Sequence, residues 1–178
     1  MCDIVALDCE MVKGKCGHIC GRVVVVTFSS ENKCEVLLDT FVSYPKGVVL
    51  NCMSKWSRIY PWMLESGKPL PVVQKMVVSM VRGKTLVTQN GNCDLRSLSL
   101  DPLFIRRICN HVELQNYFKR EDGSGYGLGP LVEYFGYKED GNPVIIDHDC
   151  VQDAFYTLRL LVSLDTTHSY FLLPKSCR

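Results

Sequence analysis

The chain has 178 residues, of which 47% are hydrophobic and 22% are charged, a globular composition that excludes a disordered chain. No apolar run approaches the ~20 residues of a membrane span, so we expect no association with a membrane. Because 20 Lys and Arg residues nearly balance 19 Asp and Glu residues, the net charge is +1, and any nucleic-acid binding must rest on a local site.

The first third of the chain is predicted to form three strands. Apolar and β-branched runs at residues 4–9, 22–28 and 34–42 are typical of strands, and residues 29–32 carry a turn signal. Short connections of this kind predict an antiparallel meander. Residues 44–66 show no clear period, and we expect them to be mostly irregular.

The rest of the chain alternates helices with strands. Helical spacing of apolar residues predicts helices, and short apolar runs predict strands. The helices are expected at residues 70–82, 94–100, 127–135 and 150–164, and the strands at residues 84–88 and 108–114. Asp149 is placed to cap the last helix, with Gln152 three residues on. This order predicts one α/β domain over residues 1–178, with a mixed β-sheet flanked by helices.

Ten cysteines bear on the compartment and on metal binding. The N-terminus has no basic segment followed by a long apolar one, so we expect no secretory signal. We therefore interpret most of the cysteines as reduced thiols of an intracellular protein, nuclear or cytoplasmic. Cys16, His18 and Cys20 leave open a structural metal site, although their alternate spacing is not the usual paired spacing.

Four acidic residues and one histidine stand at the ends of predicted elements. Asp8 and Glu10 lie two apart on the first strand, so their side chains point to the same side. Asp94 follows the fourth strand. Asp153 lies one turn into the last helix, and His148 just precedes that helix. Each is unremarkable alone, but two carboxylates on one side of a buried strand repel each other unless a cation lies between them.

This set of residues suits metal-dependent phosphodiester hydrolysis. Mg²⁺ and Mn²⁺ prefer oxygen ligands. Two such ions clamp the attacking and leaving oxygens of a phosphoryl group. A neutral histidine beside them accepts the proton of the attacking water.

Three motifs of the sequence resemble those of the DEDDh 3′–5′ exonucleases. They are Ala6–Val12 (ALDCEMV), Leu86–Leu95, and His148–Ala154 with its H-x-x-x-x-D spacing. More narrowly, the chain is similar to the Rex-type RNA exonucleases and the interferon-stimulated 20 kDa exonuclease. The resemblance covers about residues 4–164 and implies a ribonuclease H-like (RNase T-type) fold.

The resemblance also implies roles for individual residues. Asp8, Glu10 and Asp153 would hold the catalytic metal, with Asp8 bridging to a second ion that Asp94 supports. His148 would be the general base, and Met11 would lie near the terminal nucleotide of the substrate. The implied cofactors are two divalent cations, Mg²⁺ or Mn²⁺. The implied reaction releases nucleoside 5′-monophosphates from the 3′ end of single-stranded RNA or DNA.

The sequence departs from the family pattern at two places. Thr88, Gln89 and Asn92 stand where the family has glycine and histidines before the second-motif aspartate; none of these is a metal ligand. In addition, residues 51–54 stand where RNA-preferring members carry an arginine that reaches the ribose. Because the 2′-hydroxyl is what distinguishes RNA from DNA, the absence of this arginine leaves both RNA and DNA as candidate substrates.

Two alternative functions, and the role of three aromatic residues in one loop, are not decided by the sequence. The same fold could serve as a non-catalytic nucleic-acid-binding or scaffolding module, or as an endonuclease or small-nucleotide hydrolase. Within residues 44–66, Trp56, Tyr60 and Trp62 either stack on bases or pack the loop onto the core.

Overall fold

The computed structural model describes residues 4–29, 33–137, 149–167 and 171–172. A seven-stranded sheet forms its centre, in the order β5-β3-β2-β1-β6-β7, with β4 paired to β1 off this path. Its strands are β1 (Ile4–Gly14), β2 (Gly17–Phe28), β3 (Cys34–Ser43), β4 (Val49–Asn51), β5 (Lys68–Pro69), β6 (Thr85–Thr88) and β7 (Asn110–Glu113). β1 pairs antiparallel with β2 and parallel with β6, so the sheet is mixed, as predicted.

The predicted meander of β1, β2 and β3 is confirmed, and its first two strands are longer than expected. β2 pairs antiparallel with both neighbours. Beyond residue 10, β1 and β2 continue as a two-stranded ribbon to a turn at residues 14–17, and this ribbon carries exposed polar residues. The apolar pattern used for the prediction therefore ends before the strands do.

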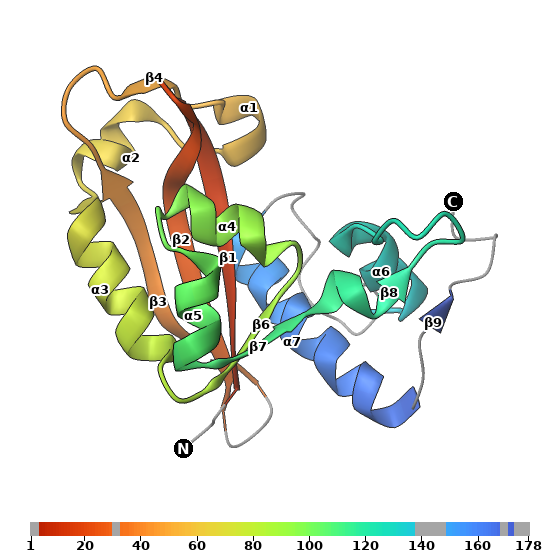
Figure 1. Ribbon diagram of the computed structural model, residues 1–178. Coiled ribbons are helices and arrows are strands. Elements are labelled where there is room, and N and C mark those ends of the chain that lie inside the picture. Colours follow the sequence, from red (N-terminus) through yellow and green to blue (C-terminus); the bar gives the residue numbers. More distant parts are fainter. Residues whose placement is uncertain (1–3, 30–32, 138–148, 168–170, 173–178) are drawn as a thin grey trace.

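Helices cover both faces of the sheet (Figure 1). The helices are α3 (Leu70–Val81), α4 (Gly91–Ser97) and α5 (Pro102–Ile108) on one face, and α6 (Leu128–Tyr134) and α7 (Cys150–Thr167) on the other. Val73, Val77 and Val81 of α3 pack in the first core, and Ala154 and Leu158 of α7 pack in the second. Each face thus buries one apolar stripe per helix against the β-branched strands.

Three local predictions need correction. Residues 44–66 are not mostly irregular, because they contain β4 and two short helices, α1 (Ser54–Ser57) and α2 (Pro61–Glu65). α5 was not predicted, although Asp101 caps it by accepting from the Leu103 N–H at 2.9 Å and Pro102 opens it. α4 begins three residues before the predicted start, because a side chain from β7 satisfies its first N–H groups (see below).

The remaining elements are small. A 3₁₀ turn (Leu114–Asn116) follows β7, and β8 (Phe118–Lys119) pairs with β9 (Phe171–Leu172) in a separate two-stranded sheet. Across the described ranges, no helix is long and apolar enough to span a bilayer.

Candidate active site

The alternation of β1 places two carboxylates on the face that α7 covers. Leu7 and Cys9 point into the core beneath α3, and Ala6 points into the core beneath α7. Because side chains alternate along a strand, Asp8 and Glu10 share the α7 face with Ala6. A register shift follows Glu10, where the pairing with β2 passes from Arg22 to Cys20. The two carboxylates therefore stand where the regular strand gives way to the ribbon.

The first turn of α7 is fixed against β1. Asp149 caps the helix as predicted, and its Oδ1 accepts from the Val151 N–H at 2.9 Å. The buried Cys150 thiol donates to the carbonyl oxygen of Asp8, with a sulfur-to-oxygen distance of 3.2 Å. Three residues later, Asp153 projects toward the strand. A hydrogen bond between helix and strand thus sets the distance between carboxylates that are far apart in sequence.

Asp8, Glu10 and Asp153 form one acidic cluster. One carboxylate oxygen from each lies within 4.8 Å of the others, and all three side chains are half-buried. Burial, followed by repulsion from Asp8 and Asp153, raises the pKa of Glu10 from 4.5 to about 8. A carboxyl group that resists ionisation near neutral pH marks a place where negative charge exceeds what the protein neutralises.

Asp94 lies behind this cluster. It belongs to the first turn of α4, is only 6% exposed, and stands outside the group of three. Burial, and then the nearby charges of Asp8 and Glu113, raise the pKa of Asp94 well above its usual value. The structure therefore brings all four predicted carboxylates into one electrostatic unit, three in the cluster and one beside Asp8.

The cation near the cluster is engaged elsewhere. Arg22 pairs with Glu10 in the strand register and lowers the pKa of Glu10. Its guanidinium, however, donates two hydrogen bonds to Asp39, at 2.8 and 2.7 Å. Such a bidentate pair satisfies most of the arginine charge. A metal ion is the natural partner for the remaining negative charge, since three close carboxylates supply the oxygen ligands that Mg²⁺ and Mn²⁺ prefer.

Sequence reasoning missed Glu113, a buried residue that holds the start of α4, the helix that carries Asp94. The Glu113 carboxylate accepts from the backbone N–H groups of Asn90 and Gly91, each at 2.7 Å, and from the Thr88 hydroxyl at 3.3 Å. These are the first N–H groups of α4, which the chain would otherwise leave without partners. β6 and β7 are parallel neighbours, so a carboxylate at the end of β7 naturally reaches the helix that follows β6. The expected pairing of these two strands was the signal that could have predicted the role of Glu113.

Two of the residues that depart from the family pattern, Thr88 and Gln89, make hydrogen bonds to neighbouring elements. Thr88 is fully buried, and its hydroxyl lies 2.7 Å from Nε2 of His111. The amide of Gln89 donates to the carbonyl oxygen of Tyr126 at 2.6 Å. These residues therefore connect β6 to its neighbours, and neither belongs to the acidic cluster.

Two predicted residues and one predicted alternative remain. His148 lies outside the described residues. Met11 is half-buried beside Glu10, and its contact with a nucleotide stays a prediction. Cys16, His18 and Cys20 do not come together, because Cys20 is buried and donates to the carbonyl oxygen of Arg22 while the other two are exposed. Of the possible ligand groups within the described ranges, the acidic cluster alone qualifies as a metal site.

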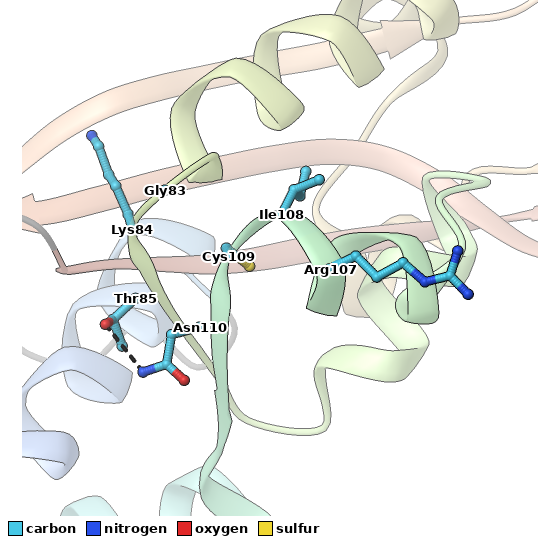
Figure 2. Close-up of a pocket in the computed structure, with 7 residues that line it drawn as sticks. All are labelled: Gly83, Lys84, Thr85, Arg107, Ile108, Cys109 and Asn110. Atoms are coloured by element: carbon cyan, nitrogen blue, oxygen red, sulfur yellow. Dashed lines mark hydrogen bonds between the residues drawn. The ribbon is translucent and has the colours of Figure 1, made fainter.

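A cavity at the opposite end of β6 and β7 is a poor candidate site. It measures about 380 Å³ and is lined by Gly83, Lys84, Thr85, Arg107, Ile108, Cys109 and Asn110 (Figure 2). Asn110 donates to the Thr85 hydroxyl at 3.3 Å, and the side chains of Lys84 and Arg107 point apart. Nothing there converges on a ligand.

Comparison with known proteins gives two kinds of match. In sequence, the chain is 33% identical over 162 residues to a Homo sapiens protein named RNA exonuclease 4 and 39% identical over 160 residues to its Xenopus laevis counterpart. Each match covers 88% of this chain but only 36% of the relative, so the chain spans about a third of their length. No protein-family model matches.

In structure, the chain is similar in fold to parts of two larger proteins. It matches the Neurospora crassa Pan2 catalytic unit, which contains protease and nuclease domains, with a TM-score of 0.73 at 18% identity, over 92% of this chain and 27% of that one. It matches E. coli Exonuclease I bound to a dA16 oligonucleotide with a TM-score of 0.61 at 13% identity, over 93% of this chain and 41% of that one. The predicted ribonuclease H-like fold is confirmed, and the predicted resemblance to the exonucleases is supported by sequence relatives that are named as RNA exonucleases.

Proposed function

We propose that this relative of the RNA exonucleases is itself a metal-dependent 3′–5′ exonuclease, which hydrolyses single-stranded RNA from the 3′ end and releases nucleoside 5′-monophosphates. The observation that carries the proposal is the cluster of Asp8, Glu10 and Asp153, whose oxygens lie within 4.8 Å of one another. The sequence relatives are named as RNA exonucleases, which favours RNA as the substrate.

The residues divide the chemistry between them. Asp8, Glu10 and Asp153 would hold one divalent cation, Mg²⁺ or Mn²⁺, and Asp94 beside Asp8 would support a second. When bound, such ions lower the pKa of water and neutralise charge that develops on the phosphoryl oxygens. His148 would accept the proton of the attacking water, and Met11 would contact the terminal nucleotide.

The environment of the cluster supports these roles. The pKa of Glu10 is raised by burial and by the negative charges of Asp8 and Asp153, and a bound cation would neutralise this excess negative charge. Cys150 and Glu113 fix the helices that carry Asp153 and Asp94, so the four carboxylates are positioned before a substrate arrives.

A labelled-strand assay tests the proposal. Two single strands of identical sequence, one RNA and one DNA, carry a 5′ label and are incubated with Mg²⁺, with Mn²⁺ or with a chelator. We expect a ladder that shortens one nucleotide at a time from the 3′ end, that disappears with the chelator, and that forms faster on RNA.

Matched variants separate the cluster from the rest of the chain. Asp8→Asn should abolish cleavage, whereas Asp101→Asn should not, because asparagine also caps α5. Cleavage by the Asp8→Asn protein would refute the proposal. Internal cuts would indicate an endonuclease instead. Binding without any cleavage would favour the non-catalytic module.

We further propose an intracellular location. The eight cysteines that the structure describes are all free thiols, four of them buried, as expected for a reducing compartment. Assigning the nucleus or the cytoplasm requires imaging of the tagged protein.

A further inference from the structure

Three aromatic side chains lie exposed on the segment between β4 and β5, which contains α1 and α2. Trp56, Tyr60 and Trp62 are 58%, 48% and 64% exposed. We call them the aromatic surface. The sequence left open whether they pack the loop onto the core, and the structure excludes packing as their main role. Ile59 and Leu64 do that instead, since both are buried against Val12.

The segment is held rigid from within. The Ser54 hydroxyl donates to the carbonyl oxygen of Ile59 at 2.5 Å, and the Ser57 hydroxyl donates to that of Cys52 at 2.7 Å. Met53 and Arg58, which flank α1, adopt the left-handed conformation with φ of 53° and 56°. Non-glycine residues at positive φ are uncommon and persist where the surroundings impose them. The aromatic rings are thus displayed by an ordered loop.

The aromatic surface adjoins the acidic cluster on the same face of β1. Val12 follows Glu10 by two residues and therefore points to the same side. Ile59 covers Val12 so closely that a Cβ added at Gly21 would meet Ile59 Cδ1 at 2.5 Å and Val12 Cγ1 at 2.8 Å. β4, which precedes the segment, pairs with β1 at Lys13, about 10 Å along the strand from Glu10. α1 lies beside this end of β1 (Figure 1).

Basic side chains and a cavity lie near the aromatic surface. The Lys55 ammonium lies 4.9 Å from the centre of the Trp56 ring, and Arg58 is exposed beside it. A cavity of about 760 Å³ borders the segment, and its lining includes Ser54 and Pro61, neighbours of the aromatic residues, together with one cation, Lys46, and one anion, Glu65. Positive groups interleaved with aromatic faces form the surface that single-stranded nucleic acids use, through phosphate contacts and base stacking. Apolar protein partners would not require the cations.

Resting on the proposed function, we infer that the aromatic surface binds the single-stranded RNA substrate upstream of its 3′ end. Bases a few nucleotides from the scissile bond stack on Trp56 and Trp62, while Lys55 and Arg58 contact the phosphates. Stacking tolerates any base, because every base has a π-face. The surface therefore gives the protein a preference for longer strands and not for a sequence.

The two tryptophans of the chain are Trp56 and Trp62, so intrinsic tryptophan fluorescence reports on this surface alone. A ten-nucleotide RNA is titrated into the protein in chelator, which prevents cleavage. A strand with the same phosphates but no bases serves as the reference. We expect quenching by the RNA and little by the base-free strand. Affinity should fall roughly tenfold in Trp62→Ala and in Trp56→Ala, with partial rescue by phenylalanine.

Phe104→Ala is the matched control, since Phe104 is 41% exposed on α5 and should leave the affinity unchanged. Equal quenching by both strands, or undiminished RNA affinity in both tryptophan variants, would overturn the inference. Hydrolysis of a dinucleotide, too short to reach the surface, tests the proposed function separately. Dinucleotide hydrolysis without quenching refutes the surface alone, and quenching without hydrolysis of either substrate refutes the nuclease alone.

Discussion

Replacing Glu10 by glutamine should stabilise the metal-free protein at pH 8, although it removes a proposed metal ligand. The pKa of Glu10 is about 8 in the folded chain, against 4.5 for the free side chain. Between these values the folded state binds more protons than the unfolded state, so the free energy of unfolding falls as the pH rises. The destabilisation is complete above about pH 8 and absent below about pH 4.5.

The size of the effect follows from the same values. A fully buried carboxyl group with this difference in pKa would cost roughly 5 kcal/mol at pH 8. Glu10 is only half-buried, and solvent screening reduces this figure to about 2 kcal/mol. For a chain of this length, that corresponds to a melting temperature roughly 4–8 °C higher in the glutamine variant.

Thermal unfolding of both proteins, measured in chelator at pH 5 and pH 8, tests the predicted difference in melting temperature. The wild type should lose stability between these values, and Glu10→Gln should lose less, keeping only the pH dependence that Asp94 contributes through its own raised pKa. Millimolar Mn²⁺ should stabilise the wild type more than the variant, because the ion binds the folded cluster. A variant that melts below the wild type at pH 8 in chelator would refute the reasoning.

Four other changes test separate parts of the site. His148→Ala should slow turnover by ~10²–10⁴-fold and abolish the rise in activity from about pH 6 to 8; a loss below tenfold removes the histidine from the base role. Glu113→Gln should lower the melting temperature by about 3–8 °C and raise the Mn²⁺ concentration needed for half-maximal activity, because the start of α4 loses charge-assisted hydrogen bonds; unchanged metal dependence would argue against support of Asp94. Gly91→Ala should cost ~1–3 kcal/mol, because its Cβ would overlap the Thr88 side chain, whereas Gly129→Ala, with open space around it, should not destabilise. Asp39→Asn should change the unfolding free energy by less than about 1 kcal/mol, since the ion pair with Arg22 is partly exposed; chemical denaturation measures the difference, and a larger loss would show that the pair is a structural requirement.

Local patterns were enough to predict much of the fold. The β-branched runs of β1, β2 and β3 and the helical spacing in α3 and α7 are each contained in one segment, so periodicity reveals them. The Asp149 cap is equally local and was predicted correctly. α5 had the same kind of signal in Asp101 and Pro102, but its short length hid its apolar stripe.

The candidate site divides in the same way. The sequence by itself was enough to select the four acidic residues that the structure brings near one another, because Asp8 and Glu10 share a strand face and the motif resemblance points to Asp94 and Asp153. Only the tertiary structure decided how they meet. The Cys150 thiol ties α7 to β1 across 142 residues of chain. Glu113 reaches α4 from a neighbouring strand, and Ile59 carries the aromatic surface onto the face of Glu10. These contacts join side chains from distant segments, so no periodicity within one segment encodes them.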